Sequence, residues 1–364
     1  MKIAIIGTRG IPNAYGGFEQ FAEYLSKYLC NNGHSVTVYN SSNHPYQDTV
    51  WNGVNIVHIY DPENKIGAVG QFIYDLKCIL HSRNQQFDLI LQLGYTSSSI
   101  WGFLFNRKTK IFTNMDGLEW KRSKYSNPVQ KFLKYAEYLG IKYSDHIIAD
   151  SIGIKKYLEA KYNINTSYIP YGAEIFKTPD ERVVELQNLT PFEYDLIIAR
   201  LEPENNIETI LNGFTKSTIK RQILVIGNQQ TKFGQYLVEK FMLDGRIVFF
   251  GPIYDIDILN NLRYFSNIYF HGHSVGGTNP SLLEAMASHG LICAHNNVFN
   301  KAILEGHAFY FEECGEITKI VETIDKNDYS EFLNRNLEKI SSLYSWERVN
   351  KSYEQLFESK IKIE

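Results

Sequence analysis

The stretch MKIAIIGTRGIPNAYGGFE, residues 1–19, decides the fold of this chain. Residues 3–6 are apolar, with three isoleucines, and Gly7 follows them, which predicts a short buried strand over residues 2–6. A glycine-rich loop follows, and over residues 17–30 apolar side chains recur at helical spacing. Strand, glycine-rich loop and helix in this order are typical of the first βαβ unit of an open α/β sheet.

Short β-rich runs alternate with amphipathic stretches along the rest of the chain, which predicts parallel sheets built from βαβ units. In a first series we expect strands at residues 2–6, 35–39, 54–58, 88–92, 110–115, 145–149 and 166–169, with helices at 17–30, 68–83, 128–143 and 151–161. In a second series we expect strands at 194–199, 222–226, 246–250, 267–271 and 291–294, with helices at 206–216, 231–243, 255–264 and 279–289. The turn-rich residues 170–191 separate the two series, and a helical tail is expected over residues 329–360.

The predicted fold class is therefore α/β, with two Rossmann-like domains whose parallel sheets face each other across a cleft. We expect the first domain over residues 1–175 and the second over residues 190–345. The final helix, within residues 346–364, is expected to pack back on the first domain. Open α/β sheets bind ligands at the carboxyl ends of their strands, so we expect the ligand in the cleft.

Composition excludes several classes of protein. The 37 Lys and Arg residues against 40 Asp and Glu residues give a net charge of −3, which provides no positive field for a nucleic acid partner. No C-x-x-C pair occurs among Cys30, Cys78, Cys293 and Cys314, so neither a zinc site nor a disulfide framework is expected, and the predicted location is cytoplasmic. No apolar run approaches the roughly 18 residues of a membrane span, so any contact with the inner face of the plasma membrane would be peripheral.

Two strand–loop–helix segments open the two series and are candidate anion sites. In the first, Gly16 and Gly17 stand where free amides and the positive end of a helix favour a phosphate, unless these glycines only shape a turn. In the second, Arg200 follows strand 194–199, where its guanidinium could hold a diphosphate or form a structural ion pair.

A third such segment spans residues 271–287. Thr278 or Asn279 is the expected N-cap of its helix, with Pro280 as the first helical residue. The backbone amides of residues 277–279 could hold a phosphate or a sugar hydroxyl. Glu284 could accept hydrogen bonds from a ribose, or it could serve only the helix dipole.

Two further pairs of polar residues are candidate sites. We expect His271 and His273 to point to opposite faces of the extended chain, with no other His or Cys close in sequence, so no metal site is predicted. Asp116 and Glu119 follow strand 110–115 at its carboxyl end, where they could meet a substrate hydroxyl. A surface Asp-Gly turn is the alternative for Asp116.

These three segments, in this order, resemble the retaining family 4 glycosyltransferases of GT-B fold. The segments GTRGIP and YGGFE, within residues 7–19, are most similar to a bacterial branch of rhamnosyltransferases. Further matching segments are residues 116–122, 149–151, 169–174, 200–205 and 272–284. The resemblance runs from residue 1 to about residue 290, and it implies a nucleotide-sugar donor with neither a metal nor another cofactor.

The resemblance also implies roles for individual residues. Gly16 and Gly17 would contact the donor diphosphate or sugar, Arg200 would neutralise the leaving diphosphate, and Glu284 would hold the donor ribose. The expected catalytic residues are Asp116, Arg200 and Glu284. The expected donor-binding residues are Arg9, Gly16, Gly17, Arg200, Asn205, His273, Gly276, Gly277, Thr278, Asn279 and Glu284. The expected acceptor-binding residues are Asp116, Glu119, Lys121 and Arg122.

Three positions depart from the pattern of the broader family. Asn205 stands where a Lys is usual, so Arg9 or the amides of residues 276–279 must compensate for a missing cation. Gly276 replaces the first Glu of an E-x7-E pair, and Met115 replaces a His. Together these departures suggest a 6-deoxy sugar such as L-rhamnose, carried on dTDP, as the transferred group.

Basic residues surround the predicted helix at 128–143, which also carries apolar and aromatic side chains. They are Lys121, Arg122, Lys124, Lys131, Lys134 and Lys142. Such a helix could rest on an anionic leaflet and draw in a lipid-diphosphate-linked sugar or oligosaccharide as acceptor, or it could be a solvated face. The expected function is sugar transfer in bacterial surface polysaccharide synthesis. A nucleotide-sugar 2-epimerase of the same fold, or a binding protein without catalysis, are the alternatives.

Overall fold

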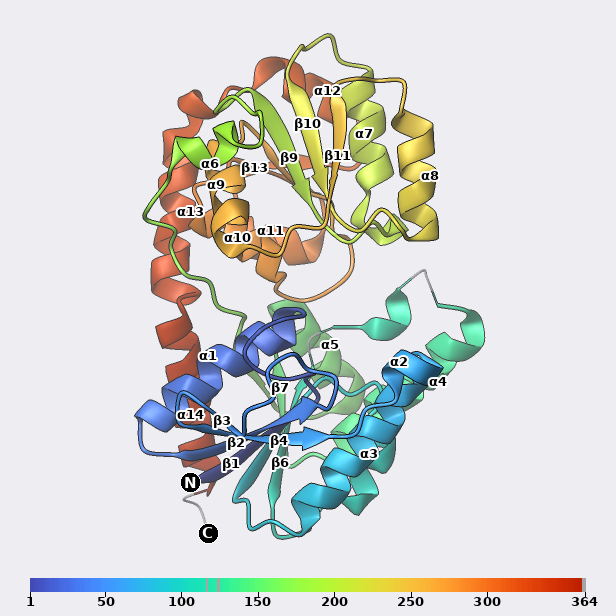
Figure 1. The fold of residues 1–364 in the computed structure, drawn as a ribbon, viewed down its shortest axis with the longest axis vertical. Coiled ribbons are helices and arrows are strands. Elements are labelled where there is room, and N and C mark those ends of the chain that lie inside the picture. Colours follow the sequence, from blue (N-terminus) through green and yellow to red (C-terminus); the bar gives the residue numbers. More distant parts are fainter. Residues whose placement is uncertain (116, 123–124, 362–364) are drawn as a thin grey trace. The chain divides into compact units, whose positions relative to one another are not determined.

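The chain forms two compact α/β units (Figure 1). The structure is a computed structural model that describes residues 1–115, 117–122 and 125–361. The first unit takes in the described residues up to Lys121, those of Tyr125–Tyr171, and the chain from Trp346 onward. The second unit takes in Arg122 and Gly172–Ser345. Within the described residues, no helix is long and apolar enough to cross a lipid bilayer.

The first unit is built on an eight-stranded sheet with the order β3-β4-β2-β1-β5-β6-β7-β8. Its strands are β1 (Lys2–Ile6), β2 (Ser35–Ser41), β3 (Val50–Trp51), β4 (Val54–Ile59), β5 (Leu89–Leu93), β6 (Lys110–Met115), β7 (His146–Ala149) and β8 (Thr166–Tyr168). All neighbours pair in parallel except the short β3, which is antiparallel to β4. The strand order reverses between β1 and β5, so β1 lies in the middle of the sheet.

Helices cover both faces of this sheet. They are α1 (Gly17–Asn31), α2 (Glu63–Ile66), α3 (Val69–Arg83), η1 (Ser99–Leu104), η2 (Glu119–Lys121), α4 (Asn127–Lys142), α5 (Ile152–Tyr162) and α14 (Trp346–Ile361). Ile3 and Ile5 of β1 join the core under α1 and α14, whereas Ala4 and Ile6 join the core under α3. A strand buried on both faces requires the continuous apolar run that residues 3–6 supply.

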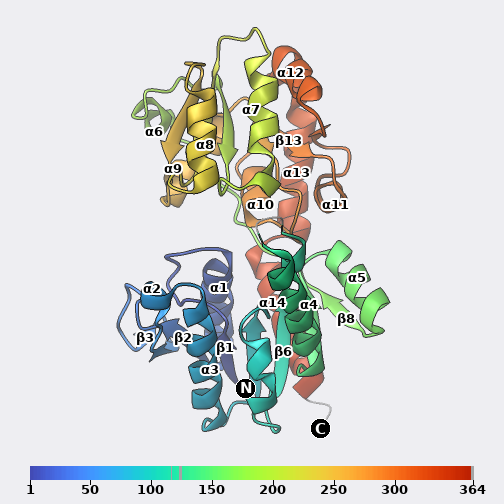
Figure 2. The ribbon, with the colours of Figure 1, turned by 90° about the vertical axis from the view of Figure 1, so that its right-hand side faces the viewer.

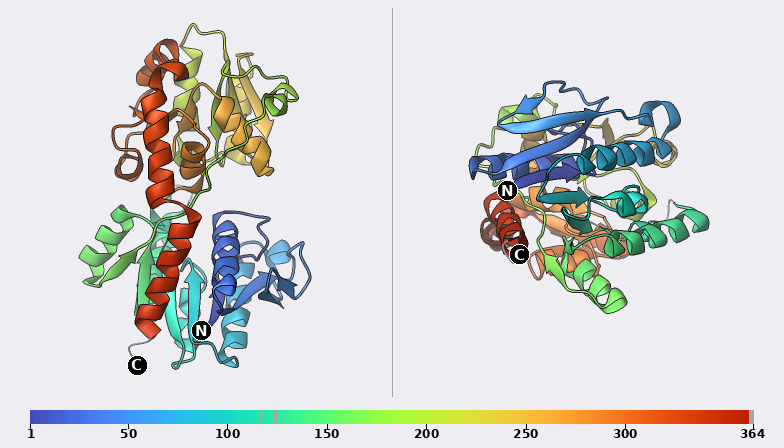
Figure 3. Two further views of the ribbon diagram at one scale, coloured as in Figure 1. Left: turned by 90° about the vertical axis from the view of Figure 1, so that its left-hand side faces the viewer. Right: turned by 90° about the horizontal axis from the view of Figure 1, so that it is seen from below.

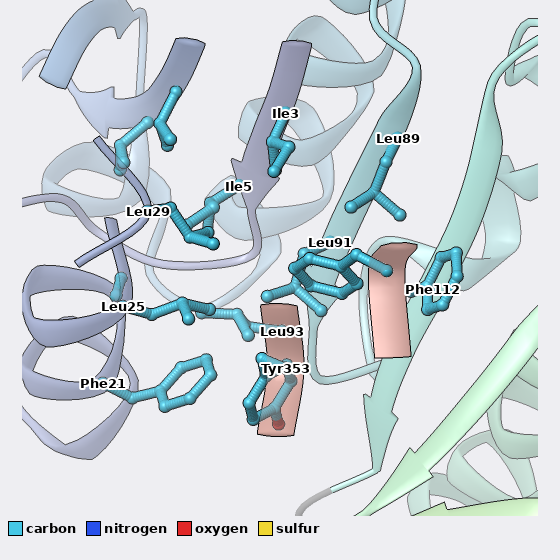
Figure 4. Packing of buried hydrophobic residues seen from close by; sticks show 14 of the residues in the cluster. Ile3, Ile5, Phe21, Leu25, Leu29, Leu89, Leu91, Leu93, Phe112 and Tyr353 are labelled. Atoms are coloured by element: carbon cyan, nitrogen blue, oxygen red, sulfur yellow. The ribbon is translucent and has the colours of Figure 1, made fainter. Parts of the chain in front are cut away.

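The core under α1 combines residues from opposite ends of the chain (Figure 4). Phe21, Leu25 and Leu29 follow one stripe of α1 and face the side chains of β1 and β5. Tyr353 of α14 lies beside them, and its hydroxyl accepts a hydrogen bond from Asn114 Nδ2 at 2.7 Å. Helix α14 is therefore an integral part of the first unit.

The second unit has a six-stranded parallel sheet with the order β11-β10-β9-β12-β13-β14. Its strands are β9 (Tyr194–Ile198), β10 (Gln222–Ile226), β11 (Ile247–Gly251), β12 (Tyr269–His271), β13 (Ile292–His295) and β14 (Phe309–Phe311). Its helices are α6 (Glu181–Glu185), η3 (Pro203–Asn205), α7 (Ile207–Thr215), α8 (Lys232–Phe241), α9 (Ile256–Phe265), α10 (Pro280–Ala287), α11 (Val298–Leu304), α12 (Cys314–Thr323), η4 (Lys326–Tyr329) and α13 (Ser330–Leu343). One core lies under α7, α8 and α12, and α10 packs against both α9 and α13 (Figure 2).

The helical tail expected over residues 329–360 is two helices rather than one. α13 ends at Leu343 and α14 begins at Trp346, and the break falls where the chain passes from the second unit to the first (Figure 3). Glu354 of α14 accepts hydrogen bonds from Asn32 Nδ2 and pairs with His34 Nε2, each at 3.0 Å. These contacts and the buried face of α14 fix the helix to the first unit.

Candidate functional site

The predicted binding segments lie where the strand order of each sheet reverses. In the second unit this point is between β9 and β12, which precede Arg200 and residues 272–279 respectively. In the first unit it is between β1 and β5, and the glycine-rich residues 7–17 follow β1. Open α/β sheets bind their ligands at such switch points.

The loops that follow β9 and β12 contact each other through backbone atoms. A Cβ atom at Gly272 would lie only 2.0 Å from the carbonyl oxygen of Asn205, so only glycine fits there. Asn206 Nδ2 donates to the carbonyl of Gly272 at 2.8 Å, and both the amide and the hydroxyl of Ser274 donate to the carbonyl of Glu204. The two loops are thereby fixed side by side.

The loop before α10 presents backbone amides without acceptors. The amides of Val275, Gly276 and Gly277 donate no hydrogen bond to any residue that the structure describes. Gly276 has φ +133°, a conformation that favours glycine. The side chain of Asn279 caps α10 by accepting from the amide of Ser281 at 3.0 Å, which confirms one of the two predicted N-caps. Unpaired amides at a helix N-terminus form an anion-binding site, and the buried Thr278 lies within this loop.

Arg200 is exposed and lies two residues after the end of β9. Strand β9 pairs with β12, the strand that precedes the loop described above. Among the described residues the guanidinium of Arg200 has no hydrogen-bond or ion-pair partner, so its charge is available to a ligand. Asn205, which occupies the position of the missing Lys, is buried, and its Nδ2 donates to the carbonyl of Arg200 at 2.8 Å. Asn205 therefore shapes the backbone of the Arg200 loop and contributes no charge.

Glu284 of α10 is held by an arginine that the sequence interpretation missed. Arg263 of α9 is only 1% exposed, and its Nη2 donates to Glu284 Oε2 at 2.5 Å, while its Nη1 donates to Asn260 Oδ1 at 3.0 Å. The other oxygen of Glu284 makes no hydrogen bond with the described residues. This arrangement orients the carboxylate and leaves one oxygen to accept from a ligand hydroxyl.

The two histidines of the third segment lie together, so the prediction that they point apart was wrong. The rings of His271 and His273 stack with centroids 4.3 Å apart and an interplanar angle of 14°. Residues two apart in an extended segment project to the same face, which explains the stacking. Within the described part of the chain, no group of three His, Cys, Asp or Glu side chains is arranged to hold a metal ion.

In the first unit, the loop after β1 is shaped by buried polar contacts. Gly7 has φ +84°, and a Cβ atom there would lie 2.2 Å from the carbonyl oxygen of Leu93. Glu19 Oε1 accepts from Thr8 Oγ1 at 3.0 Å and from the amide of Arg9 at 2.7 Å. These bonds hold the loop over the start of α1, where Gly16 is an N-cap without a capping side chain.

The start of α1 is a second cluster of unpaired amides. The amides of residues 16–19 donate no hydrogen bond within the described residues, which suits the anion site predicted at Gly16 and Gly17. Arg9, however, already has a partner. Its guanidinium forms a bidentate pair with Glu63, in which Nε donates to Oε2 at 3.1 Å and Nη2 to Oε1 at 2.7 Å, and it lies 4.0 Å from the ring centroid of Tyr15. Its charge is therefore compensated within the first unit.

A buried carboxyl lies in the same unit. Asp75 of α3 accepts from Ser97 Oγ, and burial raises its pKa to about 7, with the nearby charge of Asp61 adding to the shift. The apolar stripe of α3 gave no indication of this group, because a single Asp in a helix resembles a surface residue.

The four residues predicted to bind the acceptor do not share one environment. Asp116 lies outside the described residues. Glu119 is partly buried in η2, Lys121 is exposed beside Trp120, and Arg122 is partly buried and belongs to the second unit. Trp120 Nε1 donates to Glu137 Oε2 at 3.0 Å. Glu137 is fully buried and also accepts from three groups of α5, namely Tyr157 Oη, Lys161 Nζ and Tyr162 Oη.

Residues 1–174 match a family model described as a domain of unknown function, DUF1972. A comparison with curated proteins by sequence gave no match.

Solved structures resemble the whole chain. Sucrose-phosphate synthase from Thermosynechococcus elongatus has a TM-score of 0.81 at 17% identity, with 100% of each chain covered. HepE from Anabaena in complex with UDP-glucose has a TM-score of 0.76 at 15% identity, covering 98% of this chain and 99% of that one. Trehalose-6-phosphate synthase from Burkholderia multivorans has a TM-score of 0.73 at 12% identity, covering 98% and 96%. These similarities establish the GT-B fold and confirm the predicted α/β class with two Rossmann-like domains.

Proposed function

We propose that this chain is a retaining glycosyltransferase that moves a sugar from a nucleotide-sugar donor to a lipid-linked or oligosaccharide acceptor. One observation carries the proposal. At the switch point of the second unit, the free guanidinium of Arg200 and the unpaired amides of residues 275–277 follow adjacent strands. The fold of glycosyltransferases, one of them solved with UDP-glucose, supports the same assignment.

The proposed chemistry follows from these groups. Departure of a nucleoside diphosphate builds negative charge, which a preorganised guanidinium and aligned amides stabilise. Glu284, oriented by Arg263, would accept hydrogen bonds from the ribose hydroxyls. The unpaired amides at the start of α1 would contact the diphosphate or the sugar. The nucleotide-sugar is a substrate in this proposal, and no further cofactor takes part.

We further propose that the transferred sugar is L-rhamnose, that its donor is dTDP-rhamnose, and that the reaction serves bacterial surface polysaccharide synthesis. Two features support it, the N-terminal segments GTRGIP and YGGFE and the replacement of a carboxylate by Gly276. Gly276 removes a charged partner that would suit the hydroxyls of a fully hydroxylated hexose.

A nucleotide panel tests the proposal. We expect one of UDP, GDP or dTDP, with its sugar conjugates, to raise the unfolding temperature in a thermal-shift assay, because ligand binding stabilises the folded state. Incubation of the preferred nucleotide-sugar with a lipid-diphosphate-linked acceptor should then give a glycosylated lipid. Failure of the whole panel to stabilise the protein would refute the proposal. A new sugar nucleotide formed without acceptor would instead identify the epimerase, and binding without any product would identify the inactive binding protein.

Helix α4 supports a peripheral membrane contact of the first unit. Beyond the first turn, where Asn127, Pro128 and Val129 are exposed, its exposed side chains are basic or aromatic, namely Lys131, Phe132, Lys134, Tyr135, Tyr138 and Lys142. The acidic residue of this helix, Glu137, is buried on the opposite side. Phe103 of η1, which packs against α4, is 62% exposed. A face of lysines and aromatic rings matches the headgroup region of an anionic leaflet.

Neutralising the three lysines of this face should weaken binding to anionic vesicles. Each Lys near a charged surface contributes about 1 kcal/mol, so changing Lys131, Lys134 and Lys142 to Gln should cost tenfold or more in affinity. Cosedimentation with phosphatidylglycerol-containing vesicles, at low and high salt, measures this. The matched control changes Lys177, Lys220 and Lys319, three exposed lysines of the second unit, to Gln. Equal binding by both triple variants would contradict the proposed contact.

A further inference from the structure

His273 is held rigidly at the switch point of the second unit. Its carbonyl accepts from Asn297 Nδ2 at 3.0 Å and from Asn300 Nδ2 at 3.2 Å. The next residue, Ser274, is fixed by its two hydrogen bonds to the carbonyl of Glu204. These hydrogen bonds fix the backbone of His273 and of the residue after it. Both precede, in sequence, the unpaired amides of residues 275–277.

The ring of His273 has hydrogen-bonding capacity that the described residues do not use. Both ring nitrogens of His271 and Nδ1 of His273 are buried without a partner. Nε2 of His273 is not among the buried atoms and makes no hydrogen bond within the described part of the chain. His271, itself 1% exposed, stacks on His273 and prevents its ring from turning away. Nε2 is therefore the one nitrogen of this pair that a ligand can reach.

The imidazole of His273 is uncharged at physiological pH. Burial lowers its pKa to about 3, and the positive charges of Arg200 and Arg122 act in the same direction. A neutral imidazole offers one donor and one acceptor, which matches a hydroxyl group. Phosphate oxygens only accept, and Arg200 with the loop amides already supplies donors for them. The neutral imidazole of His273 is therefore better suited to bind the uncharged sugar of the donor than its charged diphosphate.

We propose that Nε2 of His273 binds a hydroxyl of the transferred sugar and so discriminates between sugars on the same nucleotide. This inference rests on the proposed function. Gly276 has no side chain that could bind the hydroxyls of the sugar, and in this proposal His273 binds them instead. His271 acts as a positioning residue, because it fixes the ring of His273 by stacking.

The test compares binding of a nucleoside diphosphate with binding of its sugar conjugate. The pairs used are UDP with UDP-glucose, GDP with GDP-mannose and dTDP with dTDP-rhamnose, and the tightest pair is taken forward by calorimetry. His273→Ala should weaken binding of the nucleotide-sugar about tenfold or more, because a buried polar contact is lost, and should change binding of the diphosphate less than twofold.

Two conservative variants make the test specific to one atom. The amide of Gln extends to the position of Nε2, whereas that of Asn extends only to the position of Nδ1. His273→Gln should therefore retain most of the affinity for the sugar conjugate, and His273→Asn should behave like alanine. Thermal unfolding of each variant controls for folding, and the comparison of Gln with Asn remains valid if alanine destabilises the unit.

The outcomes separate this inference from the proposed function. Equal losses for the diphosphate and its sugar conjugate would place His273 against the phosphates and overturn the inference. Unchanged affinity in all three variants would also overturn it. If the wild-type chain bound none of the six probes, the proposed function itself would fail.

Discussion

Arg200→Ala is expected to lower turnover by about 100-fold or more and to weaken binding of the nucleotide-sugar donor. The guanidinium stands at the switch point of the second unit and has no partner among the described residues. Its proposed partner is the diphosphate, whose charge grows as the sugar leaves. Because Arg200 is exposed and unpaired, its removal should change the free energy of unfolding by less than about 0.5 kcal/mol. Steady-state kinetics and a thermal melt of the same variant measure the two effects.

Two variants serve as controls for this experiment. Arg200→Lys keeps the charge without the bidentate fork, so its turnover should lie between those of the wild type and the alanine variant. Arg182→Ala removes an exposed arginine of the same unit, paired with Asp180, and should leave turnover unchanged. Wild-type turnover in Arg200→Ala would exclude a role for this residue in stabilising the leaving group.

Phe357→Ala is expected to destabilise the first unit by about 3–5 kcal/mol, the usual cost of removing a buried Phe side chain. Phe357 of α14 is fully buried, and its ring meets that of Phe112 on β6 edge to face at 5.3 Å. The resulting cavity would lie between α14 and the centre of the sheet.

Tryptophan fluorescence can follow this unfolding selectively. All four tryptophans, Trp51, Trp101, Trp120 and Trp346, belong to the first unit, and Trp346 stacks on Tyr24 at 4.5 Å. The urea midpoint of this signal should fall strongly in Phe357→Ala. Phe103→Ala, at an exposed position of the same unit, should leave it unchanged. A Phe357→Ala midpoint equal to that of the wild type would show that α14 contributes little to the unit.

Most of the fold follows from local patterns in the sequence. All twelve predicted strands and eight helices of the two series are confirmed, with ends that differ from the predicted ones by at most two residues. The additional strands β3 and β14 have two and three residues, which is too short for a periodic pattern. α12 begins with a capping box of Glu313 and Glu316 rather than the usual Ser or Thr, so the common N-cap signal is absent.

The site separates into local features that the sequence predicts and tertiary features that it does not. The N-cap at Asn279 follows from short-range rules, because a cap depends on neighbouring residues. The pairing of Arg9 with Glu63 joins residues 54 positions apart, and no local pattern indicates it. One feature of the sequence does point to Arg263. It lies four residues after Leu259, and so on the same buried face of α9. A charged residue in an apolar stripe indicates a buried partner, here Glu284.

The position of α14 has a consequence for biosynthesis. A ribosome delivers the eight strands of the first sheet early, yet the helix that completes the core beneath α1 emerges only after the whole of the second unit. Until then, the apolar side chains that α14 covers remain exposed to solvent, among them Phe21 and Phe112. The unit that begins the chain is therefore the last to be finished, and during translation its open face is the part of the nascent protein that most needs protection from aggregation.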